Sequence, residues 1–381
     1  MRTTIRLVAL VSAASIALAA CGGAAATPAP ATAPPATAAP ATEAPATAAP
    51  TEAPATAAPV AFKACMVSDT GGIDDNSFNE NAWKGMEDAK AKLGVEVKFL
   101  ESRAATDYEK NINQFISEKC DMIVTVGFLL GDATKAAAEA NPNIRFAIVD
   151  FAYDPAIPNV EGLVYTTNEA AMLAGYVSAG MSKSGTMGTF GGINIGGGVT
   201  DFMDGFVAGA NYYNKEAGKS VSVLGWDAVK KEGSFTGNFD SLDDAKALTV
   251  PMLQEGADVI LPVGGPIGGG AYTALQETPA EDYGIGVDVD WVQSAPQYRD
   301  VLLTSVLKKI DVSVTAAVER AVKGETAQAV FVSTLANGGV DLGPFNDFDA
   351  KVPQALKDGV AALKAKIISG EVKVADYFAA Q

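Results

Sequence analysis

The feature that most restricts the possible folds is an alternation of short apolar strands and amphipathic helices, which runs through the chain twice. Consecutive segments are joined by short connections, which is typical of a parallel sheet wound on both faces by helices. Two runs of similar size predict two such lobes, and clefts between domains are preferred sites for small ligands. The sequence therefore predicts an α/β protein with two doubly wound parallel-sheet lobes and a cleft between them.

The expected segments divide into two groups along the chain. In the first group we expect strands at 65–67, 95–100, 122–126 and 145–149, and helices at 82–93, 108–119 and 132–140. In the second group we expect helices at 169–181, 201–216, 242–255, 269–276, 312–322 and 353–369, and strands at 186–190, 220–224, 258–262, 285–287, 302–306 and 330–333. A long polar loop, GWDAVKKEGSFTGNFDS, interrupts the second group.

The first loop of the folded part lies in the stretch MVSDTGGIDDNSFNENAW, residues 66–83. It follows a buried strand and enters a helix that begins near Ser77. Open α/β sheets place their ligands at loops that leave the carboxyl ends of the strands. We therefore expect this loop to form one side of the cleft. Asp69 is expected to bond the ligand or loop amides, whereas Asp74 and Asp75 are expected to hold the turn.

The composition argues against several classes of function. The formal net charge is −17, which disfavours binding to nucleic acid or to an anionic membrane surface. The chain has no histidine, so it lacks the usual general base and the commonest transition-metal ligand. Enzymes built on carboxylates or lysine stay possible, but we expect a binding protein with no catalytic residues, no cofactor and no metal.

The start of the chain is not expected to fold. Arg2 and Arg6 precede a short apolar run that ends in LAAC at Cys21, which is typical of a bacterial lipoprotein signal. We expect residues 1–20 to be a signal peptide, and Cys21 to carry the lipid that anchors the protein to the outer face of the cell membrane. A plain signal peptide or an uncleaved anchor is the alternative. Residues 21–60 are nearly all Ala, Pro and Thr, which predicts a disordered tether.

Charged side chains follow several of the predicted strands. Asp288 ends GIGVD and can accept two hydrogen bonds from vicinal sugar hydroxyls, and Lys308 after the next strand can donate to the same hydroxyls. Asp150 ends FAIVD and can accept a hydrogen bond from a ring N–H or an amine of a base. A solvated strand end or a turn cap is the plain alternative. Asp132 is a weaker candidate, expected instead to cap the helix that follows it.

One aromatic ring from each lobe could sandwich a planar base. Phe78 projects from the first loop, and Phe202 lies near the start of a helix in the second lobe. Stacking of a base on such a ring contributes on the order of 1–3 kcal/mol. A core position is the alternative for both rings, and Phe206 is expected to be core. The long loop contains three other candidates for the second ring: Trp226, Phe235 and Phe239.

Two glycine clusters, GGINIGGG and GGPIGGG, lie between a strand and a helix. Neither has the spacing of a dinucleotide site, and neither ends as a P-loop does. We expect the backbone to approach the ligand there, with the N–H groups of Gly264 and Gly265 free to bind it. The acids of the first loop lack the spacing of a calcium loop, so no metal is expected there either.

The three cysteines, Cys21, Cys65 and Cys120, do not have the spacing of a zinc site. Cys65 and Cys120 lie on or beside buried strands of one lobe, and an exported protein could oxidise them to a disulfide. Because Cys65 lies inside a strand, the favoured prediction is two buried thiols.

An ordered set of motifs resembles one family. VSDTGGIDDNSFNENAWKGM, VGFLLGDA, FAIVD, FMDGFVAG, GADVILPVGG, GIGVDVD and TSVLKKID follow one another over roughly residues 62–345, after the lipoprotein-like start. The set is similar to the basic membrane protein family of bacterial lipoproteins, which includes substrate-binding proteins of the purine nucleoside receptor A type. The resemblance implies the type I periplasmic-binding-protein fold, with two lobes joined by a three-stranded hinge.

This fold predicts how the chain is shared between the lobes. The first lobe is expected to span 61–165 and to be completed by about 309–335. The second is expected to span 166–308 and to be completed by about 336–381. The long loop at 225–241 departs from the family pattern, so its role is left open.

The resemblance also implies a function. We expect a monomeric, lipid-anchored receptor that binds a nucleoside, a purine one in particular, and passes it to the permease and ATPase of an ABC importer. Asp288 and Lys308 look like the family's ribose-binding pair, and Asp150 like its base-binding residue. Closure of the hinge over the ligand would give the permease a closed form to recognise. The alternatives are a receptor for a sugar or polyol, a nucleoside hydrolase with Asp288 as its base, and a signalling or adhesive lipoprotein.

Overall fold

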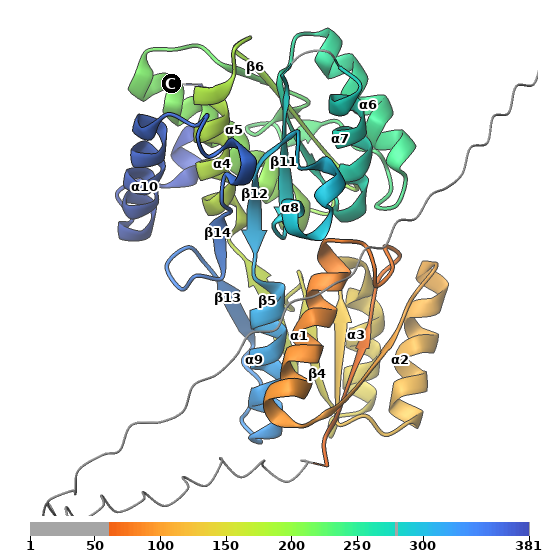
Figure 1. The fold of residues 1–381 in the computed structure, drawn as a ribbon. Helices are drawn as coiled ribbons and strands as arrows, with labels where there is room; N and C mark the ends of the chain where they lie inside the picture. Colours follow the sequence, from red (N-terminus) through yellow and green to blue (C-terminus); the bar gives the residue numbers. More distant parts are fainter. Residues whose placement is uncertain (1–60, 279–280, 381) are drawn as a thin grey trace, which may run out of the picture. The chain divides into compact units, whose positions relative to one another are not determined.

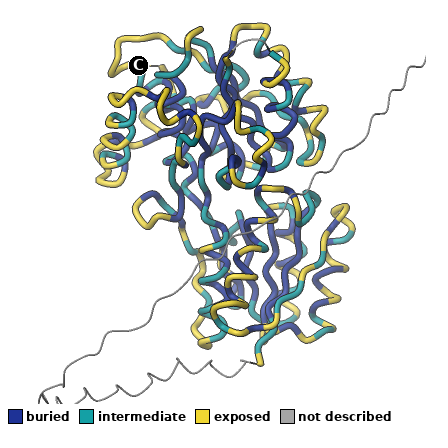
Figure 2. Tube along the Cα trace, in the orientation of Figure 1, coloured by how far each residue is buried: buried dark blue, intermediate teal, exposed yellow. Residues whose placement is uncertain are grey.

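The structure is a computed structural model that describes residues 61–278 and 281–380. The predicted signal peptide, the lipidated Cys21 and the predicted tether lie outside the described residues. Within the described part, the chain forms two six-stranded sheets and one two-stranded sheet, with helices packed against the larger ones (Figure 1). The strands are buried while the outward faces of many helices are exposed (Figure 2). No helix among the described residues is long and apolar enough to cross a membrane.

The first sheet has the strand order β2-β1-β3-β4-β5-β13, and all its pairs are parallel. Its strands are β1 (Lys63–Val67), β2 (Glu96–Leu100), β3 (Met122–Val126), β4 (Arg145–Val149), β5 (Val160–Tyr165) and β13 (Val330–Ser333). Its helices are α1 (Phe78–Leu93), α2 (Tyr108–Ser117), α3 (Gly131–Ala140) and α9 (Ile310–Val322). Side chains alternate along β1, so that Met66 joins the apolar cluster of α1 and α9 and Cys65 joins that of α2. Burial on both faces explains why these strands are apolar throughout.

The second sheet has the order β14-β12-β11-β10-β6-β7, parallel except for β14, which is antiparallel to β12. Its strands are β6 (Thr186–Gly191), β7 (Ser222–Leu224), β10 (Val259–Val263), β11 (Tyr283–Asp288), β12 (Leu302–Lys308) and β14 (Val340–Leu342). The helices of this part are α4 (Thr167–Met181), α5 (Gly197–Ala217), α6 (Leu242–Gln254), α7 (Gly268–Gln276), α8 (Trp291–Ser294) and α10 (Gln354–Ser369). Short 3-10 helices complete the chain: η1 (Ala105–Asp107), η2 (Phe128–Leu130), η3 (Gly265–Ile267), η4 (Pro296–Tyr298), η5 (Asn346–Phe348) and η6 (Val374–Tyr377).

The two sheets repeat one arrangement. In each sheet, the second strand along the chain lies at one edge, next to the first, and the third, fourth and fifth strands follow in order. A strand from late in the chain, β13 or β14, forms the other edge. The third strand of each sheet leads through a 3-10 helix into an α-helix, η2 and α3 in one case and η3 and α7 in the other. Loops after corresponding strands therefore occupy corresponding places in the two lobes.

The chain passes between the sheets at three connections, β5 to α4, β12 to α9 and β13 to β14 (Figure 1). These connections are bonded to one another. The Thr166 amide donates to the carbonyl of Ser333 at 2.9 Å, and the Lys309 amide donates to the carbonyl of Gly339 at 2.9 Å. They form the three-stranded hinge that the fold requires.

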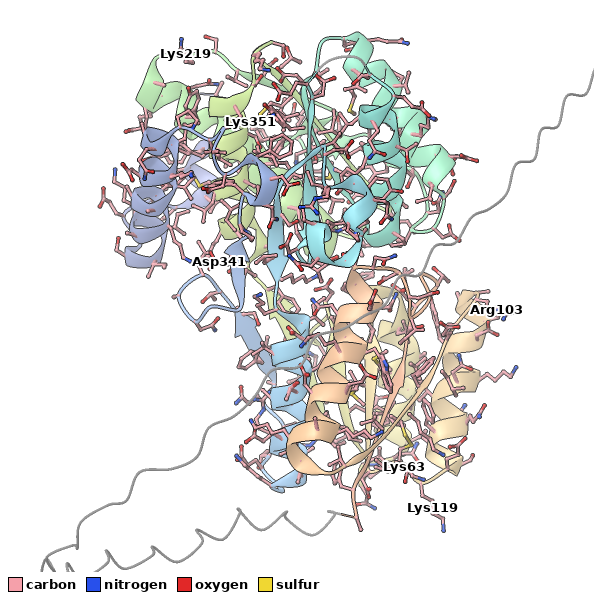
Figure 3. All side chains as sticks on the ribbon, viewed as in Figure 1. Lys63, Arg103, Lys119, Lys219, Asp341 and Lys351 are labelled. Atoms are coloured by element: carbon pink, nitrogen blue, oxygen red, sulfur yellow. A yellow bond between two sulfur atoms is a disulfide. The ribbon has the colours of Figure 1, made fainter. Side chains whose placement is uncertain are left out.

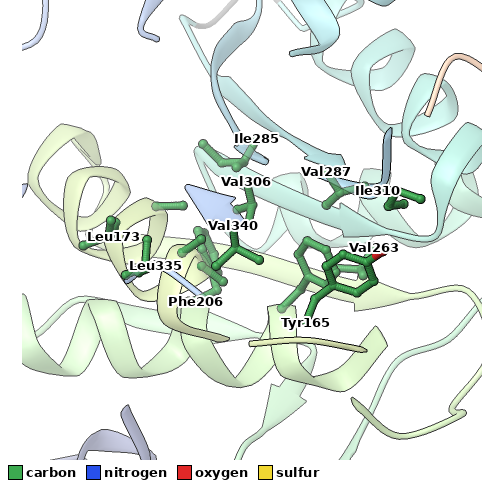
Figure 4. Close-up of a cluster of buried hydrophobic side chains, with 14 of the residues drawn as sticks. Tyr165, Leu173, Phe206, Val263, Ile285, Val287, Val306, Ile310, Leu335 and Val340 are labelled. Carbon is green, nitrogen blue, oxygen red and sulfur yellow. The ribbon is translucent and has the colours of Figure 1, made fainter. Parts of the chain in front are cut away.

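The core of the second lobe reaches the hinge. Figure 4 shows Leu173 and Phe206 packed with Val306, Leu335 and Val340, all part of one buried cluster. Phe206 is fully buried there, as expected. Residues near the connections between the sheets are thus held by packing in this core as well as by the connecting segments.

Several elements differ from the expected ones. Strands β5 and β14 and helix α8 were not predicted, and α5 begins inside the glycine cluster rather than after it. Strand β5 is hard to predict in part because it carries a buried acid, Glu161. This acid forms an ion pair with the distant Arg320, which local sequence does not reveal. The long polar loop contains a small hairpin of β8 (Trp226–Asp227) and β9 (Glu232–Gly233).

The prediction of two buried thiols is wrong, because Cys65 and Cys120 form a disulfide. The strand position of Cys65 does not prevent this bond. Its side chain points to the helix layer, where it shares an apolar cluster with Phe115 of α2. The chain returns from α2 to β3 through Cys120, which brings the two Cα atoms within 6.1 Å, inside the range of natural disulfides.

Candidate ligand-binding site

One pocket is lined by strand ends and helix starts from both lobes. About 560 Å³ of empty space, part of it open to solvent, lies between these residues. All of the residues predicted to bind a ligand line it: Asp69, Phe78, Asp150, Phe202, Gly264, Gly265, Asp288 and Lys308. The fold therefore brings these residues together from positions up to 239 apart in the sequence (308 − 69 = 239). Binding by each of them stays a prediction.

Two aspartates occupy corresponding places in the pocket. Asp150 follows β4 and Asp288 ends β11, the fourth strand of each sheet. Both have left-handed backbone angles, with φ of 63° and 68°. Such angles are uncommon outside glycine, although aspartate tolerates them better than most residues. Conformations of this kind concentrate at functional sites, which favours a role for both carboxylates in the pocket.

Lys308 is the cation of the pocket. Many lysines project from the surface, Lys119, Lys219 and Lys351 among them (Figure 3), but Lys308 is only 1% exposed. Its Nζ lies 2.5 Å from Asp150 Oδ2, so this ion pair joins strand ends of the two sheets. The same ammonium group lies 4.8 Å from the ring centre of Phe78. It therefore binds an acid while lying over an aromatic ring, both of which stabilise a buried cation.

The start of helix α1 in the first lobe is hydrogen-bonded to the ends of strands β11 and β12 in the second lobe. The fully buried hydroxyl of Ser77 donates to Asp288 Oδ2 at 2.9 Å and lies 3.3 Å from the carbonyl oxygen of Val287. One turn later, Asn81 Nδ2 donates to the carbonyl of Lys308 at 2.9 Å. The first turns of α1 thus fix where Asp288 and Lys308 lie.

Asp75 and Asp74 play different parts in the first loop. Asp75 accepts backbone hydrogen bonds from Ser77, Asn79 and Glu80 at 2.9–3.1 Å, so it holds the start of α1 as expected, and it also lines the pocket. Burial raises its pKa to about 7, against the opposing effect of these hydrogen bonds. The expectation for Asp74 is wrong. Its side chain is exposed and accepts no hydrogen bond within the described residues; only its carbonyl does, from Asn76.

Asn79 is a pocket residue that the sequence analysis missed. Its Nδ2 donates to Asp69 Oδ1 at 2.8 Å and lies 3.3 Å from Asp75 Oδ2. Two carboxylates fix the orientation of the amide, because only its nitrogen can donate to them. Its Oδ1 is buried and has no partner within the described residues. A ligand N–H or O–H could satisfy this acceptor, and the only sequence signal for it is its place beside Phe78.

The carboxylates of the pocket are poorly hydrated. Burial raises the pKa values of Asp69, Asp150 and Asp288, while Lys308 opposes this effect at Asp150 and Asp288. Asp69 is stabilised instead by Asn79 and by the amide of Gly71. Most side-chain polar atoms of the pocket are therefore acceptors, which favours a ligand rich in N–H and O–H donors. No group of three or more Cys, Asp or Glu side chains in the described parts of the chain is arranged to hold a metal ion.

Three aromatic side chains besides Phe128 reach the pocket. Phe78 comes from the first lobe, and Phe202 and Phe239 come from the second. Phe202 is 1% exposed, so it belongs to the core and also lines the pocket. The ring of Phe239 packs on Gly192, where a Cβ would lie 2.4 Å from it. Glycine at 192 is thus needed to admit this ring.

The other candidates of the long loop do not line the pocket. Trp226 Nε1 donates to Asp204 at 2.9 Å, and Phe235 packs edge-on against Trp226 with ring centres 5.9 Å apart. They hold the loop on α5, and the loop in turn presents Phe239. Asp132 also lies outside the pocket, and the prediction that it caps α3 is wrong. The helix begins at Gly131, so Asp132 is already in its first turn and exposed.

Comparisons with known proteins agree with this architecture. The family described as ABC transporter substrate-binding protein PnrA-like matches residues 62–377. The ABC transporter nucleoside-binding protein BmpA of Lactococcus lactis is 31% identical over 82% of this chain and 88% of its own length. Basic membrane protein A of Borreliella burgdorferi is 32% identical over 63% of this chain and 66% of its own length.

Solved structures give the same result. An ABC transporter solute-binding protein from Aeropyrum pernix K1 has a TM-score of 0.72 at 26% identity and covers 82% of this chain and 92% of that one. One from Conexibacter woesei has a TM-score of 0.62 at 23% identity, covers 82% of this chain and 98% of that one, and supports the fold alone. The fold is thus the predicted periplasmic-binding-protein fold, and its relatives are substrate-binding proteins. The chain belongs to the family of PnrA-like ABC transporter substrate-binding proteins, which its motifs resemble.

Proposed function

We propose that the protein is the lipid-anchored, extracytoplasmic receptor of an ABC importer and that it binds a nucleoside, a purine one in particular, between its lobes. The observation that carries this proposal is the pairing in one pocket of aromatic rings from both lobes with acids at both fourth-strand ends. A nucleoside has a flat face for the rings and O–H and N–H donors for the acids. The name of the Lactococcus lactis relative, a nucleoside-binding protein, supports the same ligand class.

Each part of a nucleoside has a complement in the pocket. Asp288 and Lys308 would bind the ribose hydroxyls, and Asp150 would accept from the base. Phe78 would stack on one face of the base and Phe202 on the other. The backbone of Gly264 and Gly265 would approach the ligand from the second lobe, and Asp69 would bond it from the first. Asn79 Oδ1 would gain a hydrogen bond from a ligand donor, because it is buried without a partner in the described part of the chain.

The transport role follows from the hinge. A ligand that contacts both lobes binds the closed form better and shifts the population towards it. The permease and its ATPase would then receive the ligand from a monomeric receptor, which the lipid on Cys21 keeps at the membrane. No chemical step is needed for this role.

Calorimetry with inosine, guanosine and adenosine tests the ligand class, with D-ribose as the test of a sugar receptor. We expect at least one nucleoside to bind and ribose not to bind. Absence of nucleoside binding at up to ~1 mM, where the binding free energy is only about −4 kcal/mol, would sink the nucleoside assignment. Analysis of the recovered ligand for free base distinguishes binding from hydrolysis.

Removing the ring of Phe78 gives the second test. Phe78→Ala is expected to weaken nucleoside binding by about 1–3 kcal/mol, because one stacking face is lost. Phe99→Ala is the matched control, since Phe99 is 40% exposed, lies in the same lobe and does not line the pocket. Equal affinities for the two variants would show that Phe78 is a core ring and not a stacking ring.

The hydrogen bond from Ser77 to Asp288 predicts a smaller effect. Ser77→Ala is expected to weaken nucleoside binding about tenfold, because Asp288 loses the donor that orients it across the cleft. Ser77→Thr keeps the hydroxyl and is expected to recover part of the affinity. Ser178→Ala is the control, because the Ser178 hydroxyl is buried without a partner in the described residues. The positioning role fails if Ser77→Ala binds as tightly as Ser178→Ala.

A further inference from the structure

A second cavity adjoins the pocket beside the β5–α4 connection of the hinge. This side chamber is partly open to solvent. It is defined by Phe151, Tyr165, Thr167 and Asp201, together with Asp150 and Lys308, which it shares with the pocket. Its walls come from both lobes, since Phe151 follows β4 while Asp201 belongs to α5. A ligand in the pocket could therefore extend a substituent into it past the Asp150–Lys308 ion pair.

Asp201 is a partly buried acid in the wall of this chamber. Its carboxylate makes no hydrogen bond or ion pair with any described residue. Burial raises its pKa to about 6, and the nearby Asp204 and Asp150 add to this effect, while Lys231 and Lys308 oppose it. A partly buried carboxylate that has no donor in the protein would be stabilised by a donor of the ligand.

A second polar group of the chamber also lacks a partner. The hydroxyl oxygen of Thr167, a residue that is 1% exposed, has no hydrogen-bond partner in the described part of the chain. Thr167 begins α4, next to the hinge crossing at Thr166. This buried hydroxyl is a second observation, separate from Asp201, that favours a polar ligand group in the chamber.

Three aromatic side chains, Phe128, Phe151 and Tyr165, also line the chamber. Phe151 packs edge-on against Phe128 with ring centres 5.2 Å apart, and Tyr165 lies with its ring centre 4.9 Å from Lys308 Nζ. Lys308 is already paired with Asp150, so Asp201 leaves the chamber with one unmatched negative charge. Aromatic faces around an unmatched carboxylate are the usual environment for an ammonium group.

We propose that the side chamber is a subsite for an amine-bearing substituent of the ligand, with Asp201 as its acceptor. This inference rests on the proposed nucleoside function and extends it, because the receptor would take nucleosides that carry a short aminoalkyl or amino group as well as unmodified ones. Asp201 acts here on binding alone, and no covalent step is involved.

Paired ligands test the subsite on the full-length protein. Each pair differs only in the amine: N6-(2-aminoethyl)adenosine against N6-propyladenosine, and 5′-amino-5′-deoxyinosine against inosine. By calorimetry we expect the amine to bind at least about tenfold more tightly than its counterpart in one pair or both. Asp201→Asn is expected to reduce that ratio to about one. Glu216→Gln, an exposed acid on the same helix, is expected to keep it.

The outcomes separate this inference from the function on which it rests. Equal binding within both pairs in the wild-type protein, or the same ratio in Asp201→Asn as in wild type, overturns the subsite while leaving the nucleoside pocket intact. Failure of all four ligands to bind overturns the nucleoside function, and the subsite with it. A ratio lost in Asp201→Asn and kept in Glu216→Gln supports the subsite.

Discussion

Replacing Lys308 with methionine is expected to lower the free energy of unfolding by about 3–5 kcal/mol and to abolish nucleoside binding. Lys308 is 1% exposed and its ammonium group lies 2.5 Å from Asp150. Methionine fills much of the same space without the charge. The change therefore leaves Asp150 as a buried carboxylate without its cation, and it removes the opposing charge from Asp288 as well.

The loss of stability in Lys308→Met is expected to grow as pH rises. Burial raises the pKa values of Asp150 and Asp288, and Lys308 opposes that rise. Without Lys308, both pKa values in the folded protein rise further above the unfolded value of about 3.9. The folded variant then binds more protons than the unfolded chain, so its stability falls as pH rises through these pKa values. The difference from wild type is expected to be largest above neutral pH and to shrink as pH falls towards 4.

Denaturant unfolding of wild type and variant at several pH values measures this effect. Lys309→Met is the matched control, because Lys309 follows directly in sequence but makes no side-chain ion pair within the described residues. The double variant Lys308→Met, Asp150→Asn is expected to regain part of the lost stability, since one of the buried charges is removed with its partner. If Lys308→Met is no less stable than Lys309→Met at neutral pH, the buried ion pair does not exist in solution.

The sequence was most informative for candidate site residues that stand directly at the ends of strands. Asp150 and Asp288 stand directly after apolar strands, and the carboxyl ends of parallel strands meet at one edge of a sheet. That rule predicts that both acids, together with Lys308 and Gly264, lie beside one cleft. The motif resemblance then made the two-lobed fold specific, because it supplied the order of these strand ends along the whole chain.

The features that sequence reasoning missed depend on contacts between distant segments. Cys65 meets Cys120 because its side chain points to the helix layer, which local strand burial does not reveal. Asn79 became a pocket residue because two carboxylates turn its amide, so that its oxygen is left unpaired. Phe239 reaches the pocket because long-range contacts hold the long loop in place, among them the hydrogen bond from Trp226 to α5. None of these follows from periodicity or spacing.

A common electrostatic theme links the pocket and the side chamber. Within the described residues that line the pocket, Lys308 is the cation, against the carboxylates of Asp69, Asp75, Asp150 and Asp288. The side chamber adds Asp201. Because Lys308 is already paired with Asp150, a negative charge on a ligand would be repelled by the other acids. A donor-rich neutral or cationic ligand gains from this arrangement, and an anionic ligand loses.

Adding a 5′-phosphate to the ligand is therefore expected to weaken binding by at least about a thousandfold, which corresponds to about 4 kcal/mol. Two unit charges about 6 Å apart repel by about 3 kcal/mol at an effective dielectric constant of 20, and a phosphate group carries nearly two charges. Repulsion from two of the pocket acids is enough to reach this loss. Calorimetry with adenosine and adenosine 5′-monophosphate measures it directly.

A further ligand distinguishes the effect of the phosphate's charge on binding from the effect of its size. 5′-O-Sulfamoyladenosine carries a neutral group of similar volume, and we expect it to bind far more tightly than the monophosphate. Raising the salt concentration should change the ratio little, because buried charges are screened much less than exposed ones. If the sulfamoyl and phosphate compounds bind equally weakly, steric exclusion explains the selectivity. If the monophosphate binds within tenfold of adenosine, the 5′ end of the ligand lies outside the acidic pocket, and the orientation that places the ribose beside Asp288 and Lys308 is wrong.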